Sequence, residues 1–238
     1  MSARREPHAL VLTLRRSKFL VLLACLLGLF LVQPMLPRSP GGEAAIHLDI
    51  AFSLVLLAGV WSVSHRLSVL IACLALAAIG LGAAWFAHGG QNQSLAMVAL
   101  ASTLVLLVIT VVSVLRHVLD AVDVTTDTIL GGVCAYMLLA LVWVLIYGIL
   151  ERLEPGSFNS SNPPLIAPRD VGALLVPDLI YYSVFTLTTI GPQEIHPISG
   201  PARAWTGIQA MVGQFYVAVL IARLVGLHTS QRSGNSGS

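Results

Sequence analysis

Long apolar stretches recur along this chain, and their length limits the folds that it can adopt. A helix needs about 20 mostly apolar residues to cross a bilayer. Five stretches meet that length, and a sixth, which contains Gln209 and Gln214, comes close. In chain order they lie at about 18–36, 44–64, 67–87, 94–116, 128–150 and 203–227. The sequence therefore predicts an all-α integral membrane protein with six transmembrane helices.

The composition indicates that lipid is the main solvent of this protein. Of the 238 residues, 56% are hydrophobic and only 10% are charged, whereas a soluble domain carries about 25% charged residues. The formal net charge of +2 gives no electrostatic basis for binding nucleic acid. Membrane lipids are therefore an expected partner and nucleic acid is not. The three cysteines, Cys25, Cys73 and Cys134, lack the spacing of a zinc site, so no cofactor is expected.

The charges between the apolar stretches predict the orientation of the chain. Basic residues in the N-terminal tail, after the second and fourth stretches and in the C-terminal tail fall on one side when there are six spans. By the positive-inside rule, both termini are then cytoplasmic. The first stretch is longer than the core of most signal peptides and is followed by Pro34 and Pro37 rather than by a small-x-small cleavage pattern. It is therefore read as a retained span.

The same boundaries divide the chain into five expected parts. These are a cytoplasmic tail at 1–17, a four-helix domain at 18–116, an interfacial linker at 117–127, a second membrane domain at 128–228 and a C-terminal tail at 229–238. In the linker, apolar Val118, Leu119 and Val122 lie opposite acidic residues, which predicts a short amphipathic helix, with a simple loop as the alternative. The C-terminal tail is polar and rich in glycine and serine, which predicts disorder.

Between the fifth and sixth stretches lies an apolar segment, at about 178–189, that is too short to cross the membrane. Pro177 and Asp178 suit the first turn of a helix, because an acidic residue stabilises a helix N-terminus. A polar turn and Pro192 follow the segment. Non-helical backbone at membrane depth is tolerated only where protein buries it or water reaches it. The segment is therefore predicted to re-enter the membrane and line a cavity, and its negative helix end favours cations there.

This segment resembles the pore of potassium channels, whose signature is Thr-Thr-Val-Gly-Tyr-Gly-Asp. The sequence Thr188-Thr189-Ile190-Gly191 matches the first half of that signature, and Glu194 stands in place of its Asp. The aromatic pair Tyr181-Tyr182 stands where the family has residues that pack behind the filter. The resemblance extends over about 118–228, and the whole chain resembles a bacterial six-span ion channel of the potassium-channel superfamily.

The resemblance implies a function and a set of functional residues. It implies a homotetramer in the bacterial inner membrane that conducts monovalent cations, K⁺ first and Na⁺ second, through a filter of backbone carbonyls. By the same resemblance 128–228 is the pore domain, and the ions are held at Thr188, Thr189 and Ile190. The remaining implied residues are Gly191, Pro192, Gln193 and Glu194 in the filter, Tyr181, Tyr182 and Phe185 as filter support, and Gly213 as a gating hinge or, equally, a small residue for close helix packing.

Pro192 and Gln193 stand where the family has filter Tyr and Gly. Proline lacks a backbone N–H and has a fixed φ, and Gln at a positive-φ position is less stable than Gly by about 1 kcal/mol or more. We expect the outer filter to depart from the potassium-channel shape, with three possible consequences. Inner carbonyl sites remain and select poorly among cations; Gln193 and Glu194 form a polar side-chain ring; or the pore is closed.

Other functions find less support in the sequence. The fourth stretch, 94–116, has Arg116 at its end and no arginines at three-residue spacing within it, so voltage sensing of the usual type is not expected. The chain has no HExxH, GxSxG or phosphate-loop motif, which argues against an enzyme. The alternative to a conducting channel is a non-conducting or modulatory channel-like subunit.

Overall fold

The computed structural model describes residues 18–35, 43–63, 67–90, 92–122, 124–160, 173–191 and 194–235. Most of these residues are helical. The helices are α2 (Lys18–Val32), the 3₁₀ helix η1 (Gln33–Met35), α3 (Glu43–Val63), α4 (Leu67–Gly90), α5 (Gln93–Asp120), α6 (Thr126–Leu153), α7 (Pro177–Leu187) and α8 (Gly200–Asn235). Two short strands, β1 (Phe158–Ser160) and β2 (Ile195–Pro197), complete the fold.

Each apolar stretch of the sequence forms a helix at the expected place. Within the described residues, three helical segments are long and apolar enough to cross a membrane, namely Gln93–Asp120, Thr126–Leu153 and Gly200–Gly226. The apolar helical segments Phe19–Val32, Leu48–Gly59 and Cys73–Ala87 are shorter. The helices therefore agree with a helical membrane protein, while the number of six spans stays a prediction.

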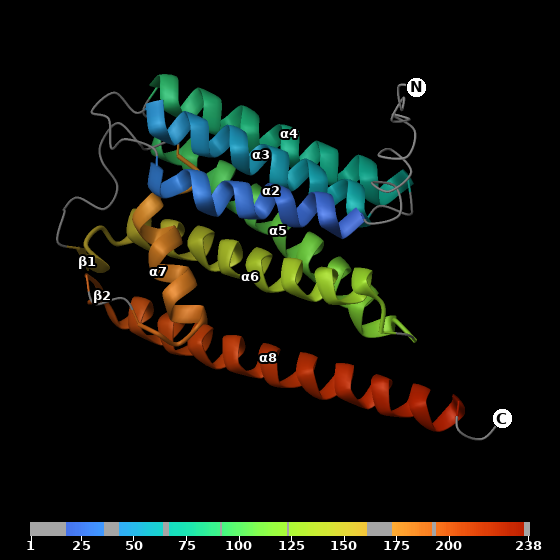
Figure 1. Cartoon of the computed structure of the whole chain (residues 1–238). Helices are drawn as coiled ribbons and strands as arrows, with labels where there is room; N and C mark the ends of the chain where they lie inside the picture. Colours follow the sequence, from blue (N-terminus) through green and yellow to red (C-terminus); the bar gives the residue numbers. More distant parts are fainter. Residues whose placement is uncertain are drawn as a thin grey trace, which may run out of the picture.

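The helices pack side by side, and α7 occupies one end of the assembly (Figure 1). α2, α3 and α4 lie on one side of α5 and α6, and α8 lies on the other side of α6. The short α7 lies between α6 and α8, at the end where β1 and β2 are found. α2 begins and α8 ends at the opposite end of the assembly.

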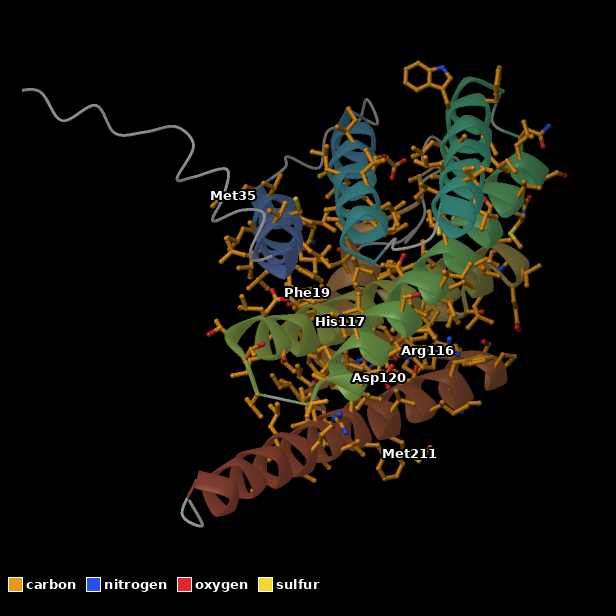
Figure 2. The ribbon with its side chains drawn as sticks, turned by 90° about the vertical axis from the view of Figure 1, so that its right-hand side faces the viewer. Phe19, Met35, Arg116, His117, Asp120 and Met211 are labelled. Carbon is orange, nitrogen blue, oxygen red and sulfur yellow. The ribbon has the colours of Figure 1, made fainter. Side chains whose placement is uncertain are left out.

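The segment between α5 and α6 differs from the predicted linker. Instead of a separate helix over 117–127, His117 to Asp120 form the last turn of α5, and α6 begins at Thr126. Val118 is buried like Val114 one turn earlier, so the apolar face of α5 continues past the expected end of the span. The ring of His117 packs on Phe19 of α2, with ring centroids 5.3 Å apart (Figure 2). This tertiary packing extends α5, and Ala121 then leaves the helix in an extended conformation.

The C-terminal tail also differs from its prediction. α8 continues to Asn235, so residues 229–235 are helical rather than disordered. Adding residues to an existing helix is far more favourable than starting a new one, which explains how a polar tail can follow a long span as helix. The predicted N-terminal tail at 1–17 and residues 236–238 lie outside the described residues.

A small sheet, which the sequence pattern does not predict, joins the two sides of the loop that holds α7. β1 pairs antiparallel with β2, with Asn159 opposite His196. The buried carboxylate of Glu151, in the last turn of α6, accepts hydrogen bonds from the backbone N–H groups of Gly156 and Phe158 at 2.8 and 3.2 Å. These bonds shape the turn that leads into β1. The sheet therefore ties the end of α6 to the segment that follows the candidate site.

Candidate functional site

α7 begins where the sequence predicts. Val176 precedes it in an extended conformation, Pro177 occupies the first turn, and Asp178 supplies the acidic residue of that turn. The side-chain amide of Gln33, the first residue of η1, donates a hydrogen bond of 3.1 Å to the carbonyl oxygen of Pro177. The start of α7 is thus held from the N-terminal half of the chain.

Two charged side chains hold the backbone that leads into α7. Arg152 of α6 is buried, and its guanidinium donates to the carbonyl oxygens of Ala173 at 2.7 Å and Gly148 at 3.0 Å. The carboxylate of Asp49, on α3, accepts the backbone N–H of Leu174 at 3.1 Å. Bonds of this kind, in which one partner is charged, are stronger than those between neutral groups. They fix the approach of α7 to α3 and α6.

A buried polar network fixes the middle of α7 to both flanking helices. The side chain of Gln209, on α8, is fully buried. Its amide nitrogen donates to the hydroxyl and carbonyl oxygens of Ser183 at 2.8 and 3.0 Å, and its amide oxygen accepts a hydrogen bond from the hydroxyl of Tyr147, on α6. The Ser183 hydroxyl donates to the carbonyl oxygen of Ala140 at 2.7 Å. Gln209 thus bonds directly to both α7 and α6.

The predicted support residue Tyr182 lies in a cluster of aromatic rings. Its ring centroid lies 5.2 Å from the ring centroids of Tyr147 and of Phe158, and both pairs have edge-on geometry. Its hydroxyl pairs with the hydroxyl of Thr206, on α8, at 2.7 Å. Aromatic rings in this arrangement attract one another beyond the effect of burial alone. Tyr182 therefore joins α7 to α6, β1 and α8.

The other two predicted support residues face a different part of the protein. The ring centroids of Tyr181 and Phe185 lie 4.3 Å apart. Both line an apolar cavity of about 320 Å³ between α2, α6 and α7, together with Phe30, Gln33, Tyr136, Met137, Ala140, Ile180, Val184, Leu187 and Thr188. A role for Tyr181, Tyr182 and Phe185 in supporting a filter stays a prediction.

α7 ends in a tightly hydrogen-bonded turn. The backbone N–H of Thr189 donates to the carbonyl oxygen of Thr186, and the N–H of Ile190 donates to that of Phe185, each at 3.0 Å. This pair of bonds is the Schellman motif, which closes many helices with a left-handed residue, usually glycine. Here the left-handed residue is Thr189, with φ of 60°. A β-branched residue in this conformation is strained, at a cost of about 1–2 kcal/mol.

The same hydrogen bonds set the direction of the carbonyl groups. The backbone N–H groups of Thr189, Ile190 and Gly191 all point back to the end of α7. In a trans peptide the carbonyl of one residue points opposite to the N–H of the next. The carbonyls of Thr188, Thr189 and Ile190 therefore point away from α7. Thr188 accepts from the Thr189 hydroxyl, whereas the other two carbonyls accept no hydrogen bond within the described part of the chain.

Gly213, the predicted hinge, lies directly against the end of α7. It is buried, and a Cβ built on it would collide with the carbonyl oxygen of Leu187. The same oxygen accepts a hydrogen bond of 3.0 Å from the hydroxyl of Tyr136, on α6. The glycine thus allows α7 and α8 to approach closely, which is the packing alternative for this residue. A hinge at Gly213 stays a prediction.

The predicted filter residues differ in how far the structure describes them. Thr188 is half-buried, whereas Thr189, Ile190, Gly191 and Glu194 are exposed. Pro192 and Gln193 lie outside the described residues, as do residues 161–172 of the loop before α7. The structure brings Thr189 next to Gln214, on α8, whose side-chain amide donates to the Thr189 hydroxyl at 3.0 Å.

The part of the chain that contains this loop is similar in sequence to a known protein family. Residues 169–229 match a family model described as an ion channel. The match covers about a quarter of the chain and includes α7, the turn after it, β2 and most of α8. No curated protein and no solved structure matches the chain.

The match and the apolar helices support two general statements. The apolar helices are those of a membrane protein, and residues 169–229 are similar in sequence to ion channels in general. The matched residues include the turn after α7, whose carbonyls point away from that helix. Helices α2 to α6 lie outside the match.

Sequence reasoning missed several residues that hold this loop. In the sequence, Gln209 is recognisable only as a polar residue within an apolar stretch. Asp49 is recognisable only as an acidic residue near the start of a different apolar stretch. Arg152 stood in a loop-like segment and is buried at the end of α6. Buried polar groups need hydrogen-bond partners, so a polar residue inside an apolar stretch is the signal that could have found Gln209.

The contact between Gly213 and Leu187 predicts the effect of one added methyl group. Gly213→Ala should lower the melting temperature of the detergent-solubilised protein, because overpacking costs about 1–3 kcal/mol. Gly207→Ala is the matched control on α8, since a Cβ there meets no atom within 4 Å. The control should be neutral or stabilising by up to about 1 kcal/mol through helix propensity. Equal melting temperatures for the two variants would contradict the close packing.

The Gln209 network predicts a specific pattern of non-additive effects. Gln209→Leu should destabilise the protein by about 1–3 kcal/mol, because the buried Tyr147 hydroxyl loses its acceptor. Adding Tyr147→Phe removes that hydroxyl and should recover part of the loss. The melting temperatures of the two single variants and the double variant test this. Strictly additive losses would argue against the network.

Proposed function

We propose that the chain is one subunit of a homotetrameric channel that conducts the monovalent cations K⁺ and Na⁺ passively across the bacterial inner membrane. In this proposal six helices span the membrane, both termini are cytoplasmic, and the residues from Thr188 to Glu194 line the ion path. The observation that carries the proposal is the direction of the carbonyls of Thr188, Thr189 and Ile190, which point away from α7 in a segment that matches ion channels.

Carbonyl groups in this arrangement suit cations. Cation channels replace the water shell of the ion with backbone carbonyl oxygens from several loops. The C-terminal end of α7 adds a partial negative charge of about half an elementary charge to the same place. Both effects favour a cation and disfavour an anion. A side-chain ring of Gln193 and Glu194 would add further oxygen ligands at the outer mouth.

The packing of α8 supports assembly from several copies. Only 11% of the most apolar 18-residue stretch of α8 is buried within one chain, compared with 61% of the corresponding stretch of α6. The exposed apolar side chains of α8 include those of Met211 and Phe215, and Met211 projects on the side away from α5 and α6 (Figure 2). One chain supplies one loop, so a closed ring of carbonyls needs four copies.

The outer filter should make this channel less selective than a potassium channel. Pro192 and Gln193 replace the tyrosine and glycine that keep the outer carbonyls in line. Without them, ions are held chiefly at the inner carbonyl sites. Because α5 carries no arginine before Arg116, we further propose that the channel is not voltage-gated in the usual way.

Conduction can be tested directly with the purified chain in planar bilayers. We expect unitary currents in K⁺ that persist when Na⁺ replaces K⁺, with no current carried by Cl⁻. The reversal potential in a K⁺/Na⁺ gradient measures the selectivity. A pore that strongly excludes Na⁺ would contradict the reduced selectivity. A stable tetramer that passes no ions would instead identify a non-conducting or modulatory subunit.

Restoring the residues of the potassium-channel signature tests the role of the outer filter. The double variant Pro192→Tyr/Gln193→Gly should raise the K⁺/Na⁺ permeability ratio by about tenfold, which corresponds to about 1.4 kcal/mol. The single variant Ile198→Val, at an exposed position just beyond β2, is the control and should leave the ratio unchanged. An unchanged ratio in the double variant would show that selection occurs elsewhere.

A further inference from the structure

Gln214 is a polar, exposed residue at the depth of the membrane. It lies near the middle of Gly200–Gly226, the membrane-length part of α8. A polar side chain at that depth is unfavourable against lipid and faces a water-filled cavity or another protein surface. Within the chain its amide reaches the loop that follows α7, because it bonds to Thr189. Gln214 therefore indicates a side of α8 that faces water or protein rather than lipid.

The hydrogen bonds of Thr189 determine how the Gln214 amide is turned. A hydroxyl has one proton, and that of Thr189 is donated to the carbonyl oxygen of Thr188 at 2.7 Å. Thr189 can therefore only accept a hydrogen bond from Gln214, which must present its NH₂ group at 3.0 Å. The amide oxygen of Gln214 is left without a hydrogen bond in the part of the chain that the structure describes.

The strained backbone of Thr189 fits the same arrangement. Its φ of 60° is the conformation for which glycine is usual at the end of a helix. A glycine would remove the strain and also the hydroxyl that bonds to Thr188 and Gln214. Strained residues of this kind persist where the surrounding structure holds them, often at functional sites. The threonine side chain thus positions the Gln214 amide beside the loop.

We propose that Gln214 lines the aqueous cavity at the inner side of the loop, and that its amide oxygen binds the permeant monovalent cation there. This inference rests on the proposed conduction of cations. Each subunit of the tetramer contributes one amide oxygen, and Thr189 keeps that oxygen turned toward the cavity. A ring of four neutral oxygens replaces part of the water around the cation before it meets the carbonyls of the loop.

Cysteine accessibility tests whether residue 214 faces water. The background replaces Cys25, Cys73 and Cys134, of which the last two are buried. In proteoliposomes, a cationic, membrane-impermeant thiosulfonate added to both sides should modify Gln214→Cys and block the current. Val219→Cys is the matched control, since it is also exposed on α8 and points about 140° away around the helix. The control should react at least about tenfold more slowly, because a lipid-facing or subunit-facing thiol is rarely ionised.

Two substitutions of opposite character test whether the amide binds the cation. Gln214→Leu keeps the size and removes all four oxygens of the ring, so the unitary K⁺ conductance at low salt should fall about fivefold. Gln214→Glu adds negative charge and should raise that conductance, because it concentrates cations in the cavity. A merely structural role for Gln214 would lower the conductance in both variants. Size-exclusion chromatography checks that both remain tetramers.

The outcomes separate this inference from the proposed function. A native chain that passes no cations overturns both. A native chain that conducts, with Gln214→Cys no faster in its reaction than Val219→Cys, overturns the inference alone. So does a common direction of change in Gln214→Leu and Gln214→Glu. Modification of Gln214→Cys together with opposite changes in conductance supports it.

Discussion

α7 ends inside the protein, and the hydrogen bonds of its last turn control the rest of the candidate site. Backbone N–H and C=O groups at membrane depth need partners, because lipid offers none. The N–H groups after α7 find theirs in the carbonyls of α7 itself. The peptide units of Thr188 to Gly191 are thereby turned so that successive carbonyls face the other way. Because the N–H groups are bonded to α7, the carbonyls of Thr189 and Ile190 are left without a hydrogen bond in the described part of the chain.

Such a turn is useful only if α7 itself is held firmly, and several parts of the chain contribute to this. The Gln209 network and the ring of Tyr182 attach α7 to α6 and α8 through buried, fully bonded polar groups and edge-on aromatic contacts. Gln33 attaches the start of α7 to η1, and Asp49 attaches the segment before α7 to α3. The N-terminal part of the chain thus contacts the start of α7 through two polar side chains at one end of the assembly.

Much of the fold could be predicted because lipid imposes a simple length rule. The apolar stretches and the short segment after Pro177 became helices within a few residues of the expected limits, except that α8 continues to Asn235. The errors occurred where distant contacts decide the local structure. α5 continues to Asp120 because His117 packs on Phe19 of α2, and β1 forms because β2 lies beside it. Neither contact has a signal in the local sequence, since both partners of each are far apart along the chain.

The sequence by itself determined that the chain is built for a membrane and that a short helix and a polar turn interrupt its last apolar region. It also placed two glutamines, Gln209 and Gln214, in one apolar helix without distinguishing them. The tertiary structure decided that Gln209 is buried against α7 and that Gln214 is exposed beside Thr189. Five residues along a helix turn a side chain by about 140°. Which of the two is buried against α7 and which stays exposed depends on where α7 packs against α8, and no local pattern contains that information.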